Sequence, residues 1–172
     1  MLLGALTTYL ANELVERSKR REKRRVRWDA KKLAAYAEYI GQVRSVVHTC
    51  VLLFEVREGM RSMARSEHDL AMDLTEAGAA QAVAFERVML LAGTEVIDRA
   101  HAVQEATAAI GWQARGVVIG TLDEWRELHA TVFRAINQFH ECARSDLRVS
   151  GTFEGDQHTA RGLLLPGRRQ PD

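Results

Sequence analysis

Apolar residues recur at alternating intervals of four and three along positions 26–54. This row consists of Val26, Ala30, Leu33, Ala37, Ile40, Arg44, Val47, Val51 and Phe54. Arg44 is its one polar member, expected either to pair with a carboxylate on another helix or to mark the rim of the bundle. Such spacing keeps one stripe of a helix facing a partner helix. A second row lies beside the first when each residue is turned by about 100°, and it consists of Tyr36, Tyr39, Val43, Val46, Cys50 and Leu53. Because the two rows cover more than half of the circumference, we predict a helix with neighbours on two sides, inside a bundle.

The remaining apolar spacing predicts three more helices. The first helix ends near Gly59, and a second runs from about Glu67 to Ala92 behind a start signal at Ser66. A third begins with Thr94 as its N-cap and ends in a glycine-punctuated loop over 111–120. A capping box at Thr121 opens the fourth. The residues expected to face inward are Leu70, Leu74, Ala77, Val83, Val88 and Leu91 of the second helix, Val96, Ala100, Val103, Thr107 and Ile110 of the third, and Leu122, Trp125, Leu128, Val132, Ile136, Phe139, Ala143 and Leu147 of the fourth.

The chain is therefore predicted to be all-α, a four-helix bundle with a long N-terminal helix that extends beyond it. Both prolines fall within the last seven of the 172 residues, so none interrupts a helix earlier. We divide the chain into an apolar and basic helical extension over 1–32, a four-helix bundle over 33–149 and a flexible C-terminal tail over 150–172.

Composition places the chain among soluble globular proteins. Apolar residues make up 47% and charged residues 27%, which argues against disorder over most of its length. Cys50 and Cys142 occupy apolar positions of predicted helices and have no CxxC or Cys/His spacing. We expect both to be reduced, buried thiols.

A net charge of +1 hides an asymmetry along the chain. Residues 1–32 carry ten basic and four acidic side chains, whereas the remaining residues carry fourteen basic and nineteen acidic ones. The ten basic residues are Arg17, Lys19, Arg20, Arg21, Lys23, Arg24, Arg25, Arg27, Lys31 and Lys32. They are expected to spread around the whole helix circumference, and the surface that seeks anions is confined to this segment.

An apolar face precedes the basic block. It consists of Leu2, Leu3, Leu6, Tyr9, Leu10 and Leu14, with no charge before Glu13. The run is shorter than the roughly 20 residues that span a bilayer, and it is not a secretory signal, because its positive charges follow the apolar run. Three interpretations remain open: an interfacial amphipathic helix, the end of a transmembrane helix that starts upstream of Met1, or a helix packed on the bundle or on another subunit.

Three interpretations also fit the basic block. Beside an apolar segment it fits the positive-inside rule and an anionic lipid surface, to which each basic residue contributes about 1 kcal/mol. A solvated charged helix without a partner is the second interpretation. Binding of nucleic acid is the third, because a basic helix that runs into heptads resembles a bZIP outline, although the apolar face is too wide for a dimeric zipper.

Motifs for catalysis or metal binding are few. There is no Glu-x-x-His of a carboxylate-bridged di-metal bundle, no Gly-x-Ser-x-Gly and no Ser-x-x-Lys. Asp98, His101 and Glu105 share one predicted helix face and are the nearest approach to a ligand set, with a solvated polar face as the alternative. His129 and His140 are expected to be half-buried packing residues. We predict no cofactor, no metal and no enzymatic activity.

The layout resembles a group of uncharacterised actinobacterial proteins. In that group a membrane helix ends in a short polar turn and leads through an Arg-rich stalk into a cytoplasmic helical bundle. The resemblance covers about residues 4–151 and is carried by Gly4 to Leu10, the basic block with Trp28, Ala35-Tyr36, Arg87 to Leu91 and Ala143 to Leu147. The group's apolar segment is usually longer than the one here. The resemblance implies no catalytic residues.

Together these features predict a non-enzymatic interaction protein. Its N-terminal apolar and basic segment would hold it at the cytoplasmic side of the cell membrane, against an anionic lipid surface, with a cytoplasmic location as the alternative. Its long first helix would allow a homo-oligomer, and a further protein partner stays unidentified. The alternative function is a nucleic-acid-binding oligomer that uses residues 17–32.

Overall fold

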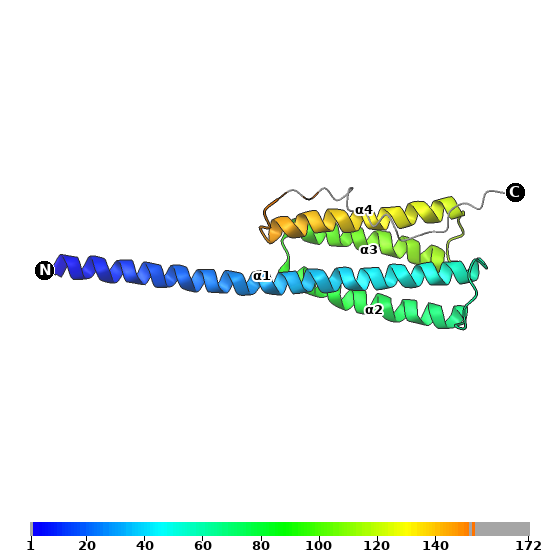
Figure 1. Cartoon of the computed structure of the whole chain (residues 1–172), viewed down its shortest axis with the longest axis horizontal. Coiled ribbons are helices and arrows are strands. Elements are labelled where there is room, and N and C mark those ends of the chain that lie inside the picture. Colours follow the sequence, from blue (N-terminus) through cyan, green and yellow to red (C-terminus); the bar gives the residue numbers. More distant parts are fainter. Residues whose placement is uncertain (1, 152, 154–172) are drawn as a thin grey trace.

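The computed structural model describes residues 2–151 and residue 153, with the side chains of 2–12, 14, 15 and 18 left outside the description. It consists of α1 (Leu2–Arg57), α2 (Glu67–Leu91), α3 (Thr94–Ala114) and α4 (Leu122–Asp146). No strand occurs within these described residues, which confirms the all-α prediction. The helices form one bundle, and α1 projects far beyond one end of it (Figure 1). Apart from positions 150, 151 and 153, the predicted tail lies outside the described residues.

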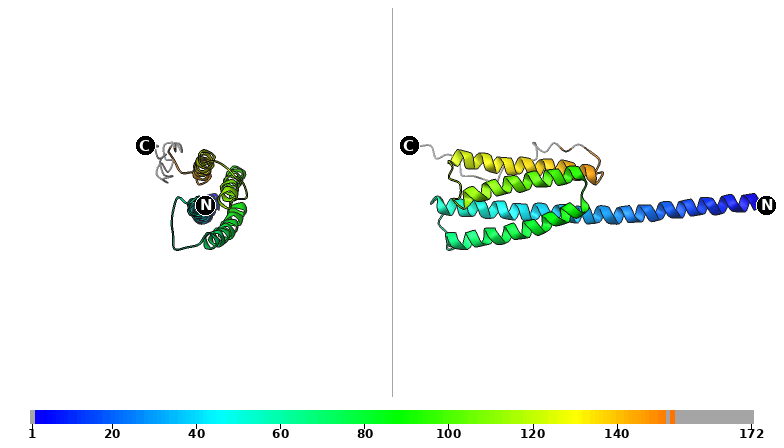
Figure 2. Two further views of the ribbon diagram at one scale, coloured as in Figure 1. Left: turned by 90° about the vertical axis from the view of Figure 1, so that its right-hand side faces the viewer. Right: turned by 180° about the vertical axis from the view of Figure 1, so that it is seen from behind.

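Each helix of the bundle runs opposite to the one before it in the chain. α1 and α2 form one long hairpin and α3 and α4 form another, so that α2 and α4 run antiparallel to α1 (Figure 1). Seen along the bundle axis, α2, α3 and α4 lie in an arc beside α1 (Figure 2). One side of α1 is therefore packed and the opposite side is left to solvent.

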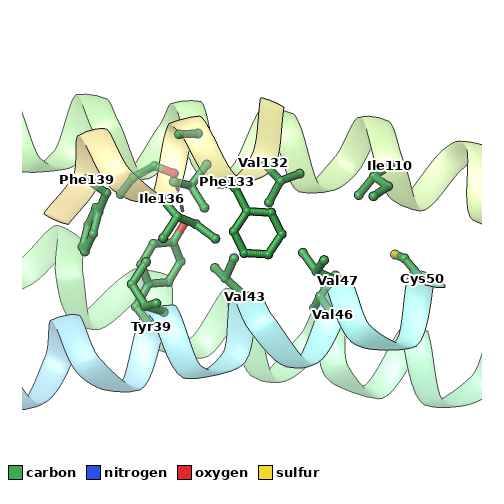
Figure 3. Close-up of a cluster of buried hydrophobic side chains, with 14 of the residues drawn as sticks. Tyr39, Val43, Val46, Val47, Cys50, Ile110, Val132, Phe133, Ile136 and Phe139 are labelled. Carbon is green, nitrogen blue, oxygen red and sulfur yellow. Dashed lines mark hydrogen bonds between the residues drawn. The ribbon is translucent and has the colours of Figure 1, made fainter. Parts of the chain in front are cut away.

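The core is built on the second predicted row of α1. All six of its side chains, from Tyr36 to Leu53, are buried, and three of them are completely inaccessible. They meet Ile110 of α3 and Val132, Phe133, Ile136 and Phe139 of α4 (Figure 3). The hydroxyl of Tyr39 donates a 2.9 Å hydrogen bond to the carbonyl of Ala100, so the polar atom of this buried side chain has a hydrogen-bond partner.

The two ends of the first predicted row differ in their exposure to solvent. Ile40, Val47 and Phe54 are buried, whereas Val26 and Leu33 are 59% and 58% exposed. Val26 precedes the bundle, whereas Leu33 borders a groove at its entrance beside Ala143 of α4, and the core faces the other row. Arg44 is exposed, so it marks the rim of the bundle.

A stack of side chains closes the far end of the bundle. The rings of Phe54 and Trp125 lie parallel at 4.0 Å between centroids. The guanidinium of Arg57 lies 6.0 Å from the Phe54 ring, and its Nη1 donates to the carbonyl of Ala114 at 2.8 Å. Arg57 thus satisfies a carbonyl at the C-terminus of α3, where a cation is also favoured by the helix dipole.

Two helix starts carry full capping boxes, as their sequences predict. The Ser66 hydroxyl accepts from the amide of Asp69 at 3.1 Å, and the Asp69 carboxylate accepts from the amide of Ser66 at 3.0 Å. Thr121 and Glu124 make the same reciprocal pair before α4. Hydrogen bonds from Ser66 and Thr121 lower the pKa of both carboxyl groups, because they stabilise the charged form.

Three local predictions are wrong. The N-cap of α3 is Gly93 and not Thr94, which is already helical. The loop predicted over 111–120 starts later, because α3 continues to Ala114 and buries Gly111. Val83, expected inward, is 60% exposed, since the buried face of α2 passes through Gln81 and Ala84 instead.

Two glycine-to-alanine substitutions should change stability in opposite directions. Gly116 has φ +73°, and a Cβ there would lie 2.6 Å from Nη1 of Arg57. We expect Gly116→Ala to lower the free energy of unfolding by about 1–2 kcal/mol. Gly78 lies inside α2, and a Cβ there would meet no atom within 4 Å, so Gly78→Ala should raise it by about 0.5–1 kcal/mol.

Urea unfolding followed by circular dichroism measures both changes. Because the two substitutions add the same methyl group, their comparison isolates the backbone and the Arg57 contact at position 116. Equal effects of the two variants would contradict this account of the α3–α4 connection.

Candidate functional site on the projecting helix

The candidate site is the part of α1 that precedes the bundle. Residues 2–31 form about 45 Å of continuous helix at 1.5 Å per residue. Apart from Lys31 at its base, which borders a groove with Leu90 and Leu91 of α2, this part extends beyond the other three helices (Figures 1 and 2). We call residues 2–31 of α1 the stalk.

Nine of the ten predicted basic residues are exposed on the stalk. Some make ion pairs along the helix: Arg17 with Glu13 at 2.8 Å, Lys19 with Glu16 at 3.3 Å, and Arg25 with two carboxylates at the 4 Å limit. Such exposed pairs contribute little to stability. Among the described side chains, no carboxylate lies within ion-pair distance of the remaining ones, which are Arg20, Arg21, Lys23, Arg24, Arg27 and Lys31.

Lys32 is the exception. Its Nζ lies 3.0 Å and 2.8 Å from the two carboxylate oxygens of Asp146, at the end of α4. The hydroxyl of Tyr36 donates to the same carboxylate at 2.7 Å, and burial together with this contact raises the pKa of Tyr36. Both members of the ion pair are about four-fifths covered. Lys32 therefore joins the stalk to the bundle, a role that sequence reasoning missed because Asp146 lies 114 positions away.

The basic residues do not surround the stalk completely. In a continuous helix at 100° per residue, they leave a sector of about 120° between Arg25 and Lys19. Among the described side chains from Arg17 to Leu33, that sector contains two acidic and two apolar residues, Glu22, Val26, Asp29 and Leu33. We call these four residues the acidic and apolar strip. They follow one another at spacings of four, three and four, and this spacing is the sequence signal for the strip, although the many basic residues beside it make it easy to overlook.

Trp28 lies within the basic sector and is 48% exposed. The ammonium of Lys31 lies 5.1 Å from the centre of its ring. An exposed indole beside cations is the amphipathic kind of side chain that settles at lipid headgroups. It also supplies a fluorescent reporter on the stalk itself.

The predicted apolar contact residues lie at the start of α1. The backbone is helical there, but the side chains of Leu2, Leu3, Leu6, Tyr9, Leu10 and Leu14 lie outside the described residues. In the part of the chain that the structure describes, no helix combines the length and hydropathy needed to cross a bilayer.

The other candidate groups fall on the bundle. Asp98, His101 and Glu105 are all exposed, and the His101 ring packs edge-on against Phe85 at 5.0 Å. Within the described residues, His, Cys, Asp and Glu side chains form no group of three that could hold a metal ion.

Both cysteines are free thiols, but only one of them is buried as predicted. Burial raises the pKa of the Cys50 thiol to about 12, which keeps it protonated and unreactive. Cys142 is only partly covered, because it lies at the edge of the face that α4 turns to the core. The expectation of two buried thiols is therefore wrong for Cys142.

His140 is a half-buried packing residue as predicted, whereas His129 is also a packing residue but is buried more fully than predicted. His129 is 7% exposed and its ring contacts Phe133 at 4.9 Å, while half-buried His140 contacts Phe139 and Phe153. Burial lowers the pKa of both imidazoles, and nearby Arg44 lowers that of His140 further.

Comparisons with known proteins do not assign a family or a function to the chain. No protein-family model matches the chain, and no match was found among curated proteins or among solved structures.

The ion pair of Lys32 and Asp146 at the base of the stalk should make a measurable contribution to the free energy of unfolding. We expect Asp146→Asn to lower the free energy of unfolding by about 1–3 kcal/mol, because it leaves the half-buried Lys32 ammonium without a carboxylate. Asp98→Asn removes an equally charged but exposed group and should change it by less than about 0.5 kcal/mol. Equal results in urea unfolding would contradict a structural role for Asp146.

The two histidines should make stability depend on pH. Their folded pKa values lie below the usual 6.5, so the unfolded chain binds more protons in that range. The stabilisation is therefore complete above about pH 6.5 and is lost as pH falls towards the folded pKa values. In unfolding titrations, His129→Gln with His140→Gln should flatten the curve between pH 7 and 5; an unchanged curve would contradict this assignment.

Proposed function

We propose that this protein is a non-enzymatic interaction protein that its stalk holds at the anionic cytoplasmic face of a membrane. The observation that carries the proposal is a single uncovered helix with nine exposed basic side chains, which follows an apolar N-terminal segment. The bundle then stands at the other end of the stalk, where its surface is free to meet another protein.

The disposition of charge supports a particular orientation. Basic residues occupy about two-thirds of the stalk's circumference. A helix that lies flat on a membrane turns only one side towards it, whereas a helix that stands upright brings all sides of its first turns near the headgroups. We therefore propose that the stalk stands upright, with the apolar segment in the interface.

The upright orientation can be tested because salt screens the attraction between basic residues and an anionic leaflet. The basic residues extend over about 22 Å of helix from Arg17 to Lys32. At physiological ionic strength the attraction of an anionic leaflet falls off within about 8–10 Å. In an upright stalk the residues nearest the N-terminus therefore supply most of the electrostatic attraction.

We expect the full chain to float with anionic vesicles in a density gradient and to lose that property when the near charges are neutralised. The near set is Arg17, Lys19, Arg20 and Arg21, each changed to Gln. With about 1 kcal/mol per basic residue, their loss should lower the vesicle partition coefficient by up to roughly a thousandfold. Flotation by neutral vesicles should be weak in every variant.

Two matched sets complete the experiment. The far set, Arg24, Arg25, Arg27 and Lys31 changed to Gln, should reduce partitioning much less than the near set. A bundle set with the same change in charge, Arg65, Arg99, Arg115 and Arg134 changed to Gln, should leave it unaltered, since these exposed arginines lie on the bundle and not on the stalk. Equal losses from the near and far sets would mean a flat stalk.

The fluorescence of Trp28 gives an independent readout. In an upright stalk Trp28 lies among the far basic residues, so on binding its quenching by acrylamide should stay unchanged, like that of exposed Trp112 on α3; a fall in the quenching of Trp28 alone would mean a flat stalk. A chain that ignores anionic vesicles but is retained by DNA, with an affinity that falls steeply with salt, would replace this proposal with the nucleic-acid alternative.

A further inference from the structure

The acidic and apolar strip of α1 stays largely uncovered within the described part of the chain. Val26 and Leu33 are 59% and 58% exposed, although they continue the heptad spacing of residues that the bundle buries. In heptad letters they occupy d positions, and each is followed by an alanine at an a position, Ala30 and Ala37. All four lie on one helix, so together they form a narrow seam suited to a single facing helix.

The described helices leave most of this seam uncovered, although Leu33 and Ala37 border a groove with Ala143 of α4. Its core row, from Tyr36 to Leu53, is turned by about 100° from the strip that contains Val26 and Leu33. The arc of α2, α3 and α4 lies on the core-row side (Figure 2). Among the described helices none is placed to pack along both Val26 and Leu33, which directs the search for a partner to another molecule.

The charges that flank the seam select both the partner and its direction. Glu22 and Asp29 occupy g positions, whereas Arg20 and Arg27 occupy e positions. In a parallel pair of helices, g residues face e residues of the partner, so that Glu22 of one copy meets Arg27 of the other. In an antiparallel pair, g faces g and e faces e, which would set acid against acid and arginine against arginine.

The contacts that these groups make inside one chain are weak enough to exchange. Glu22 and Asp29 lie 3.9 Å and 4.0 Å from nitrogen atoms of Arg25, and all three side chains are at least one-third exposed. Arg27 has no carboxylate within ion-pair distance among the described residues. Lys23 at the preceding a position limits the seam to about two heptads.

We propose that a second copy of this chain binds the strip, and that the two stalks form a short parallel coiled coil in which Val26 and Leu33 each meet their own counterpart. The pair leaves both N-termini at one end and both bundles at the other. It does not depend on lipid, so it can be tested separately from membrane binding.

Light scattering of the full chain in lipid-free buffer tests the seam. The expected mass is that of a dimer at high concentration, and Val26→Glu with Leu33→Glu should convert it to a monomer without lowering the melting temperature. The matched control is Val83→Glu with Leu90→Glu on α2, because these side chains are 60% and 83% exposed. A strip variant that stays dimeric, or a wild-type chain that is monomeric at every concentration, overturns the proposal.

Cysteine cross-linking tests the direction. In a Cys142→Ser background, with Cys50 buried, Val26→Cys and Leu33→Cys should each form a disulfide-linked dimer, whereas Arg24→Cys on the opposite side should not. Two residues seven positions apart cannot both lie on the two-fold axis of an antiparallel pair. Cross-linking at only one of them, or at neither, overturns the parallel arrangement.

A charge swap tests the flanking pair. Arg27→Glu should raise the dimer dissociation constant by roughly five- to tenfold, because two symmetry-related pairs are lost, and adding Glu22→Arg should recover most of it. Arg24→Glu makes the same change in net charge on the far side and relieves repulsion between the stalks, so it should not weaken the dimer. If Arg27→Glu and Arg24→Glu have the same effect, the pairing of Glu22 with Arg27 is overturned.

Discussion

Packing of one row of α1 side chains against the other three helices is the interaction on which the rest of the structure depends. Tyr39, Val43 and Cys50 are completely buried in this row. Because they lie in the C-terminal half of a 56-residue helix, the bundle can only assemble around that half. The N-terminal half therefore projects from the bundle as a stalk.

The junction between these halves is polar and not apolar. Lys32, the last of the basic residues, is bound by Asp146, and Tyr36 donates a hydrogen bond to the same carboxylate. The base of the stalk is therefore tied to the end of α4 as well as to its own continuation. A helix held in this way at its base presents its exposed charges at a defined distance from the bundle, which is the geometry that our proposed membrane attachment uses.

The stalk has two kinds of surface that do not compete. The basic residues nearest its N-terminus can lie at anionic headgroups, and the narrower strip of Glu22, Val26, Asp29 and, just beyond the stalk, Leu33 can face a second copy of α1. A parallel pair would double the number of basic residues at one end of the assembly. The two proposals are thus compatible, although each rests on different side chains.

The sequence by itself determined the number and type of helices, because heptad spacing, two capping boxes and the late prolines are local signals. It also showed which α1 rows are apolar, but not which of them the bundle would use. Only the tertiary structure decided that, since burial depends on where α2, α3 and α4 end. For the same reason Lys32 could be counted from the sequence as a free cation, although Asp146 engages it, and Val83 could be counted as core, although it is exposed. Local periodicity specifies a face, whereas the choice among faces is made by contacts between residues far apart in the chain.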